Sequence, residues 1–146
     1  MKKLITAALA LSVSLSAMAE VDVMDAYVRA MAPSQKMTAA FMHLTAETDR
    51  RVVAAYSNIA NSVELHTGYV EDGVMRMRQL ENGIELPAGE TVKLEPGGLH
   101  VMFIGVQTPV AEGEEVTFTL EFDNGEQQTI TAPVKSVMQK MDHSGH

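Results

Sequence analysis

Two histidines and two methionines in the middle of the chain stand at spacings that could build one metal site. His66 is followed after ten residues by Met77, and after twenty-two more come His100 and, beyond one intervening residue, Met102. Imidazole nitrogen and thioether sulfur form a borderline-to-soft ligand set, which discriminates against magnesium, calcium and manganese and favours Cu(I). The four residues therefore indicate a copper(I) site made from two histidines and two methionines.

The elements that carry these residues are expected to be short β-strands. Side chains at positions i and i+2 of a strand share a face. From Leu99 to Phe103 every second residue is apolar, so His100 and Met102 should point together to the opposite face. His66 likewise falls outside the apolar phase of its own run. Two strands thus place their histidines away from the core, as a site at a sheet surface or at the end of a sandwich requires.

Short alternating runs separated by turn signals dominate the chain, and no stretch predicts a long helix, an internal repeat or a second domain. The clearest hairpin signal is Asp123-Asn124-Gly125 between TFTLEF and EQQTITA. This pattern is typical of an antiparallel sandwich or barrel, so we expect an all-β Greek-key fold. The expected strands are Val21–Ala30, Ala39–Ala46, Arg50–Asn58, Ser62–Glu71, Val74–Leu80, Thr91–Leu94, Leu99–Val106, Glu115–Phe122 and Gln127–Val134.

The N-terminus, residues 1–19, has the pattern of a secretory signal peptide. Lys2 and Lys3 form a charged n-region, a short apolar run follows, and Ala17-Met18-Ala19 is a small-x-small cleavage site. The apolar run is shorter than the roughly 20 residues that a membrane span needs. We therefore expect export to the periplasm, cleavage after Ala19 and no membrane insertion of the mature chain.

Charge and cysteine content exclude several classes of protein. Loss of Lys2 and Lys3 changes the formal charge from −8 to −10, and an acidic chain argues against nucleic acid, whose phosphates need a basic patch. The absence of cysteine excludes blue copper centres, zinc ribbons and thiol–disulfide chemistry. The sequence also lacks the common hydrolase, metalloprotease and phosphate-loop motifs, so we do not expect an enzyme.

The stretch from His66 to Met102 resembles the PCu(A)C family of periplasmic copper chaperones. The family signature is a histidine, ten residues, a methionine, about twenty-one residues and then His-x-Met. The neighbouring segments GVMRMR, LPAGETVKLEPGG and HVMFIG are similar to the family as well. The resemblance extends over roughly residues 20–135. It departs at Thr67 and Gly68, where many members carry an extra methionine.

This resemblance implies a single cupredoxin-like domain over residues 20–135, with His66, Met77, His100 and Met102 as the copper ligands. It also implies a chaperone that holds Cu(I) and passes it to cytochrome c oxidase assembly. The partners would be copper-accepting proteins, among them a thiol-bearing one. Two rival functions stay open: a copper buffer or resistance protein with no dedicated acceptor, and a mononuclear copper enzyme.

Other methionines and histidines have more ordinary explanations. Met75 lies on the face of Met77 and is expected in the core or beside the site. Met31 and Met37 flank the loop at Pro33 and could approach the site, although packing is the simpler role for them. His43 is expected to be a structural histidine with satisfied hydrogen bonds.

The C-terminal tail, residues 136–146, loses strand character and is expected to be flexible. It carries four further metal-binding side chains, Met138, Met141, His143 and His146. Together with Asp142 the two histidines supply nitrogen and oxygen ligands, which suit Cu(II). A second, Cu(II)-binding site and a solvated tail without function are both open.

Overall fold

A computed structural model of the chain describes residues 21–136, which contain ten strands and no helix. The all-β expectation is therefore confirmed, and this range has no helix capable of crossing a membrane. The expected signal peptide lies outside the described residues, as do Met138, Met141, His143 and His146. The strands are β1 (Val21–Arg29), β2 (Met37–Ala46), β3 (Arg50–Tyr56), β4 (Ala60–Glu71), β5 (Val74–Gln79), β6 (Ile84–Leu86), β7 (Thr91–Leu94), β8 (His100–Val106), β9 (Glu115–Phe122) and β10 (Gln127–Lys135).

Every strand expected from the sequence forms, with ends that lie within two residues of the expected ones. The additional strand is β6, which pairs with β3 through Arg50 and Leu86. β6 has 3 residues. A strand pattern is recognisable only over about four or more residues, so alternation could not reveal β6.

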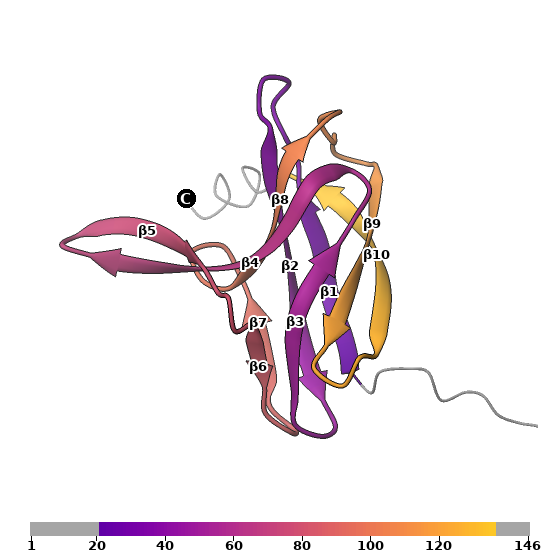
Figure 1. Ribbon diagram of the computed structural model, residues 1–146. Helices are drawn as coiled ribbons and strands as arrows, with labels where there is room; N and C mark the ends of the chain where they lie inside the picture. Colours follow the sequence, from indigo (N-terminus) through magenta and orange to yellow (C-terminus); the bar gives the residue numbers. More distant parts are fainter. Residues whose placement is uncertain (1–20, 137–146) are drawn as a thin grey trace, which may run out of the picture.

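The strands form one hydrogen-bonded sheet that packs against itself. Their order is β5-β4-β8-β2-β1-β10-β9-β3-β6, with β7 paired to β2 beside this path. All pairs are antiparallel except β1 with β10, which joins the two halves of the sheet. Phe103 of β8 lies edge-on to Phe118 of β9, with ring centroids 5.7 Å apart, so the halves enclose a common core (Figure 1).

β9 contributes the apolar side chains on one of its faces to this core. Every second residue of that strand is buried, namely Val116, Phe118, Leu120 and Phe122. Burial of a side chain such as Phe118 contributes about 1.5–3 kcal/mol. The sandwich is therefore held by apolar packing, and the described part of the chain achieves this without a disulfide.

β8 is buried on both of its faces, unlike β9. Val101 and Phe103 face the core, whereas His100 and Met102 occupy the other face and are still only 4% and 7% exposed. The alternation of apolar residues in the sequence assigns these side chains to the correct faces of the strand. The second face is nevertheless withdrawn from solvent, which gives its two polar or polarisable side chains a sheltered environment.

β4 and β5 form a hairpin that extends away from the sandwich, to the left in Figure 1. Its two turn residues, Asp72 and Gly73, have φ angles of 53° and 79°. Positive φ at both positions is what the favoured two-residue hairpin turn requires. β5 lies at an edge of the sheet, and all of its residues are exposed.

Candidate metal site

The two histidines of the predicted site lie directly opposite each other. His66 of β4 and His100 of β8 are partners in the antiparallel ladder, and their ring centroids are 5.7 Å apart. The His100 residue is 4% exposed, and the His66 side chain is 16% exposed. Opposite residues of an antiparallel pair share a face. The strand register therefore places the two imidazoles next to each other, although more than thirty residues separate them in the sequence.

Each imidazole has one nitrogen held by a hydrogen bond. Nε2 of His66 lies 2.9 Å from a carboxylate oxygen of Glu64, and Nδ1 of His100 lies 2.9 Å from the carbonyl oxygen of Gly98. Both partners are acceptors, so these nitrogens carry the protons and donate them. The tautomer of each ring is thereby fixed, with its lone pair on the other nitrogen.

The two remaining ring nitrogens are buried without a hydrogen-bond partner. They are Nδ1 of His66 and Nε2 of His100. A buried polar atom without a partner is costly and rare. Metal-binding histidines have the same arrangement, with one nitrogen donating to a carboxylate or carbonyl and the other free for the metal. The two rings fit a metal ion that would bind these nitrogens.

The two methionines reach the same face from different strands. Met102 follows His100 by two residues on β8, and Met77 of β5 stands opposite Gly68, two residues after His66. Met77, His100 and Met102 line a cavity of about 190 Å³. Met77 is 55% exposed and Met102 is 7% exposed. The four predicted residues are thus brought together, with His66 beside the cavity rather than in its lining.

Met37, Phe41 and Arg29 are among the other residues that line this cavity. Met37 of β2 lines it and is 52% exposed, so a third sulfur lies beside the predicted ligands. The Phe41 ring lies 6.2 Å from the His100 ring, and the guanidinium of Arg29 is 5.3 Å from the Phe41 centroid. From the sequence, packing was the simpler role for Met37, although its loop position allowed it to approach the site. Phe41 and Arg29 were not identified from the sequence, and neither residue has a sequence signal that would have placed it here.

A tight turn before β8 positions His100 at the start of that strand. The Gly98 amide donates to the carbonyl of Glu95 at 2.9 Å, and the Gly98 carbonyl accepts hydrogen bonds from the His100 ring and from the Gly68 amide. Gly97 has a φ of 88°. A Cβ on Gly68 would lie 2.5 Å from the Gly97 carbonyl oxygen, so only glycine allows β4 to approach the turn this closely.

The electrostatic environment keeps His100 neutral. Burial lowers the pKa of His100 below its ordinary value of 6.5, and electrostatic interaction with the neighbouring His66 ring and with Arg29 lowers it further. The hydrogen bond to the Gly98 carbonyl opposes this shift only in part. At neutral pH the imidazole therefore offers a lone pair without first losing a proton.

Thioether sulfur is available to complete a metal site at these two histidines. Among residues 21–136 no group of three or more histidine, cysteine, aspartate or glutamate side chains is arranged to hold a metal ion. The pair of His66 and His100 would complete its coordination with thioethers from Met77 and Met102. That ligand set is softer than one of imidazoles and carboxylates, and it favours a monovalent copper ion.

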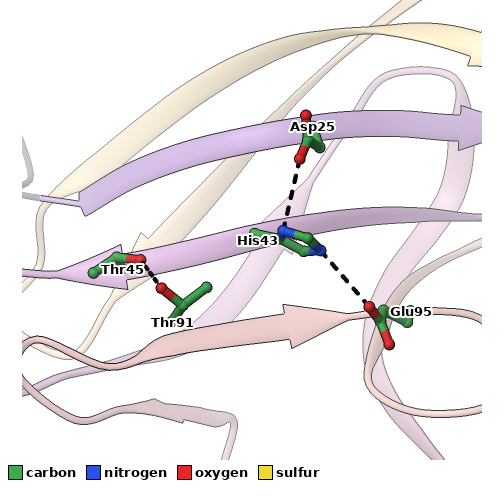
Figure 2. Close-up of polar contacts among 5 residues, drawn as sticks. All are labelled: Asp25, His43, Thr45, Thr91 and Glu95. Carbon is green, nitrogen blue, oxygen red and sulfur yellow. Dashed lines mark hydrogen bonds and ion pairs between the residues drawn. The ribbon is translucent and has the colours of Figure 1, made fainter.

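His43 lies apart from this site, between two carboxylates (Figure 2). Its Nδ1 is 3.7 Å from Asp25, which occupies a bulge of β1 at a φ of 57°, and its Nε2 is 3.7 Å from Glu95. The carboxylates flank opposite edges of the ring, so the three groups do not converge on one point. These two contacts place His43 between β1 and the turn that leads into His100, and its structural role stays a prediction.

Met75 and the tail complete the list of predicted residues. Met75 is 56% exposed and does not line the cavity, although its methyl group approaches Gly97. It therefore stands beside the site rather than in the core. The four tail residues named above lie outside the described residues.

The sequence and fold have known relatives. The LpqE-like family model ("Putative lipoprotein LpqE-like") matches residues 21–134. The chain belongs to the LpqE-like family. A protein of Leifsonia xyli subsp. xyli (strain CTCB07) named "Putative lipoprotein Lxx21020" is 36% identical over 117 residues, which make up 79% of this chain and 69% of that protein.

Solved structures agree with this membership of the LpqE-like family. Apo-DR1885 from Deinococcus radiodurans is 32% identical, with a TM-score of 0.64 over 92% of this chain and 90% of that chain. CuI-DR1885 is 31% identical, with a TM-score of 0.61 over 80% of each chain. The copper-bound PCuAC domain from PmoF2 has a TM-score of 0.66 at 22% identity, over 80% of this chain and 93% of that chain, and bears on the fold alone. The resemblance to PCu(A)C proteins and the cupredoxin-like fold are confirmed.

Proposed function

We propose that this protein is an exported copper chaperone that binds one Cu(I) ion through His66, Met77, His100 and Met102. The observation that carries this proposal is the pair of facing imidazoles whose buried nitrogens have no partner. Two thioethers on the same face complete a set of four neutral, rather soft ligands. Such ligands suit Cu(I) and discriminate against hard divalent ions.

The relatives support the choice of metal. One similar structure, 31% identical to this chain, is the Cu(I) form of DR1885. Export is supported by the signal-peptide pattern of residues 1–19 and by the lipoprotein names of the relatives. We therefore propose that the protein is exported to the periplasm.

The half-exposed position of Met77 favours a chaperone over a copper buffer or resistance protein with no dedicated acceptor. A ligand on the solvent side can be replaced by a ligand of an incoming protein, so that the ion need not pass through free solution. Neutral ligands also leave the positive charge of the ion uncompensated, which favours release. We propose copper-accepting proteins of cytochrome c oxidase assembly as recipients, a thiol-bearing one among them.

Copper transfer tests this function. The Cu(I)-loaded protein is mixed with apo acceptors of oxidase assembly, the proteins are separated, and copper is measured in each. Stoichiometric transfer to an acceptor, much faster than spontaneous loss to a chelator, is the expected result. Tight Cu(I) binding without transfer to any acceptor would favour the buffer or resistance role. Oxidase or dismutase turnover above that of free copper would favour the enzyme.

The tail is a separate hypothesis. Truncation after Lys135 removes Met138, Met141, His143 and His146. If these residues form a second site, truncation should lower the stoichiometry of Cu(II) binding and leave Cu(I) binding intact. Unchanged stoichiometry for both oxidation states would show that the tail does not bind metal.

A further inference from the structure

The sulfur atoms around the candidate site lie in two different environments. Met37 and Met77 are 52% and 55% exposed, whereas Met102 is 7% exposed. All three residues line the same cavity of about 190 Å³. Soluble reagents can therefore reach the side chains of Met37 and Met77, while Met102 is protected by burial.

Peroxides react with exposed thioethers. The sulfur lone pair attacks one peroxide oxygen, an S–O bond forms and the O–O bond breaks, and the second oxygen leaves as water after it takes up a proton. The sulfur loses two electrons and the peroxide is reduced. The product, methionine sulfoxide, is polar and can be reduced enzymatically.

We propose that Met77 is a peroxide-sensitive modification site whose oxidation makes the protein release Cu(I). The proposal rests on the function proposed above. Oxidation ties up the sulfur lone pair that would bind the metal and presents a hard oxygen in its place, which is a poor ligand for Cu(I). Met37 cannot substitute for Met77 under these conditions, because it is equally accessible to peroxide.

The fold tolerates this modification because of where Met77 lies. β5 is an edge strand whose residues are all exposed, and Met77 does not contribute to the apolar core of the sandwich. Oxidation of a buried methionine such as Met42, which is 1% exposed and belongs to the core, would disrupt packing instead. Peroxide would thus weaken metal binding and leave the sandwich folded.

The test uses limited hydrogen peroxide on the full-length protein, in the variant M24L/M37L/M75L. These substitutions remove the other exposed methionines of residues 21–136. Peptide mass mapping gives the fraction oxidised at each methionine, and competition with a chromophoric chelator gives the Cu(I) affinity. Circular dichroism reports the fold. The same variant with the additional substitution M77L controls for oxidation elsewhere, including Met138 and Met141.

We expect Met77 to be oxidised before Met102 and Met42. Replacing a residue that only supports a ligand usually lowers metal affinity by about 10–100-fold. Loss of a ligand itself should therefore lower Cu(I) affinity by more than about tenfold. Methionine sulfoxide reductase should restore the affinity, and the M77L control should show no change on oxidation.

Three results would overturn the inference: equal oxidation of Met102 and Met77, unchanged affinity after Met77 is oxidised, or loss of the fold on oxidation. A different result would contradict the function proposed above. If M77L binds Cu(I) as tightly as its parent before any peroxide is added, Met77 is not a ligand.

Discussion

The sandwich and the β4–β5 hairpin differ in what holds them in place. The sandwich surrounds fully buried side chains such as Phe103 and Phe118, whereas every residue of β5 is exposed. The hairpin extends away from the sandwich, and its β5 side pairs with β4 alone (Figure 1). One region is fixed by the apolar core and the other mainly by its backbone ladder.

The four proposed copper ligands come from both regions. His100 and Met102 come from the buried strand β8, Met77 comes from the exposed strand β5, and His66 lies where β4 leaves the sandwich. The buried half can hold two ligands in place before metal arrives. The exposed half supplies a ligand that can be exchanged, so one site combines pre-organisation with access.

The sharpest contrast in stability should come from Phe103→Ala and Val70→Thr. Phe103 is fully buried, and its truncation should cost about 3–5 kcal/mol of the free energy of unfolding. Val70 of the hairpin is 65% exposed, and its isosteric replacement should change stability by less than about 0.5 kcal/mol. Urea denaturation of both variants measures the difference. A costly Val70→Thr substitution would mean that the hairpin belongs to the core.

The junction between the two regions should be sensitive at Gly68. In Gly68→Ala the new methyl group would meet the Gly97 carbonyl oxygen, so the backbone must shift at a cost of about 1–3 kcal/mol. The turn that accepts the His100 proton would shift too, so Cu(I) affinity should fall.

Gly98→Ala is the matched control for Gly68→Ala. Its nearest contact, at 3.6 Å, is an ordinary one, and we expect little change. Equal effects of the two substitutions on the urea midpoint and on Cu(I) affinity would contradict this view of the junction.

A smaller effect should appear in the pH dependence of the stability of the apo protein. The pKa of His100 is lower in the folded protein than its ordinary value of 6.5, mainly because of burial. As the pH falls below about 6.5, the unfolded chain binds a proton at His100 before the folded protein does, so stability decreases. Above this pH both states are neutral at His100, and it adds no pH dependence.

The difference in unfolding free energy between wild type and His100→Gln isolates this contribution. Relative to His100→Gln, wild type should lose unfolding free energy as the pH falls from 7 through the window between 6.5 and the lowered pKa. A difference that stays constant, or that shifts in favour of wild type, would show that His100 is not held neutral by its surroundings.

Much of the fold could be predicted from alternation and turn residues. The period of two in Glu115–Phe122 and the Asp72-Gly73 turn are local signals, and both correspond to observed elements. The three-residue β6 is too short to produce such a signal. The burial of both faces of β8 was also hidden, because it depends on what packs over the strand.

The site could be predicted as a set of residues but not as a geometry. The alternation of Leu99–Phe103 put His100 and Met102 on one face, which the structure bears out. The direct pairing of His66 with His100 depends on strand register, and register results from the packing of the whole sheet. The contribution of Phe41 has no sequence signal of its own.

The most direct test of the central claim is the Cu(I) affinity of the double variant M77L/M102L. Leucine keeps size and apolarity, and such a swap usually costs less than about 1.5 kcal/mol of stability. The variant should remain folded by circular dichroism while its Cu(I) affinity falls by more than the about 10–100-fold that outer-shell changes cost. Competition with a chromophoric chelator under reducing conditions measures this affinity. If the folded variant binds Cu(I) as tightly as wild type, Met77 and Met102 are not ligands and the proposed copper site is wrong.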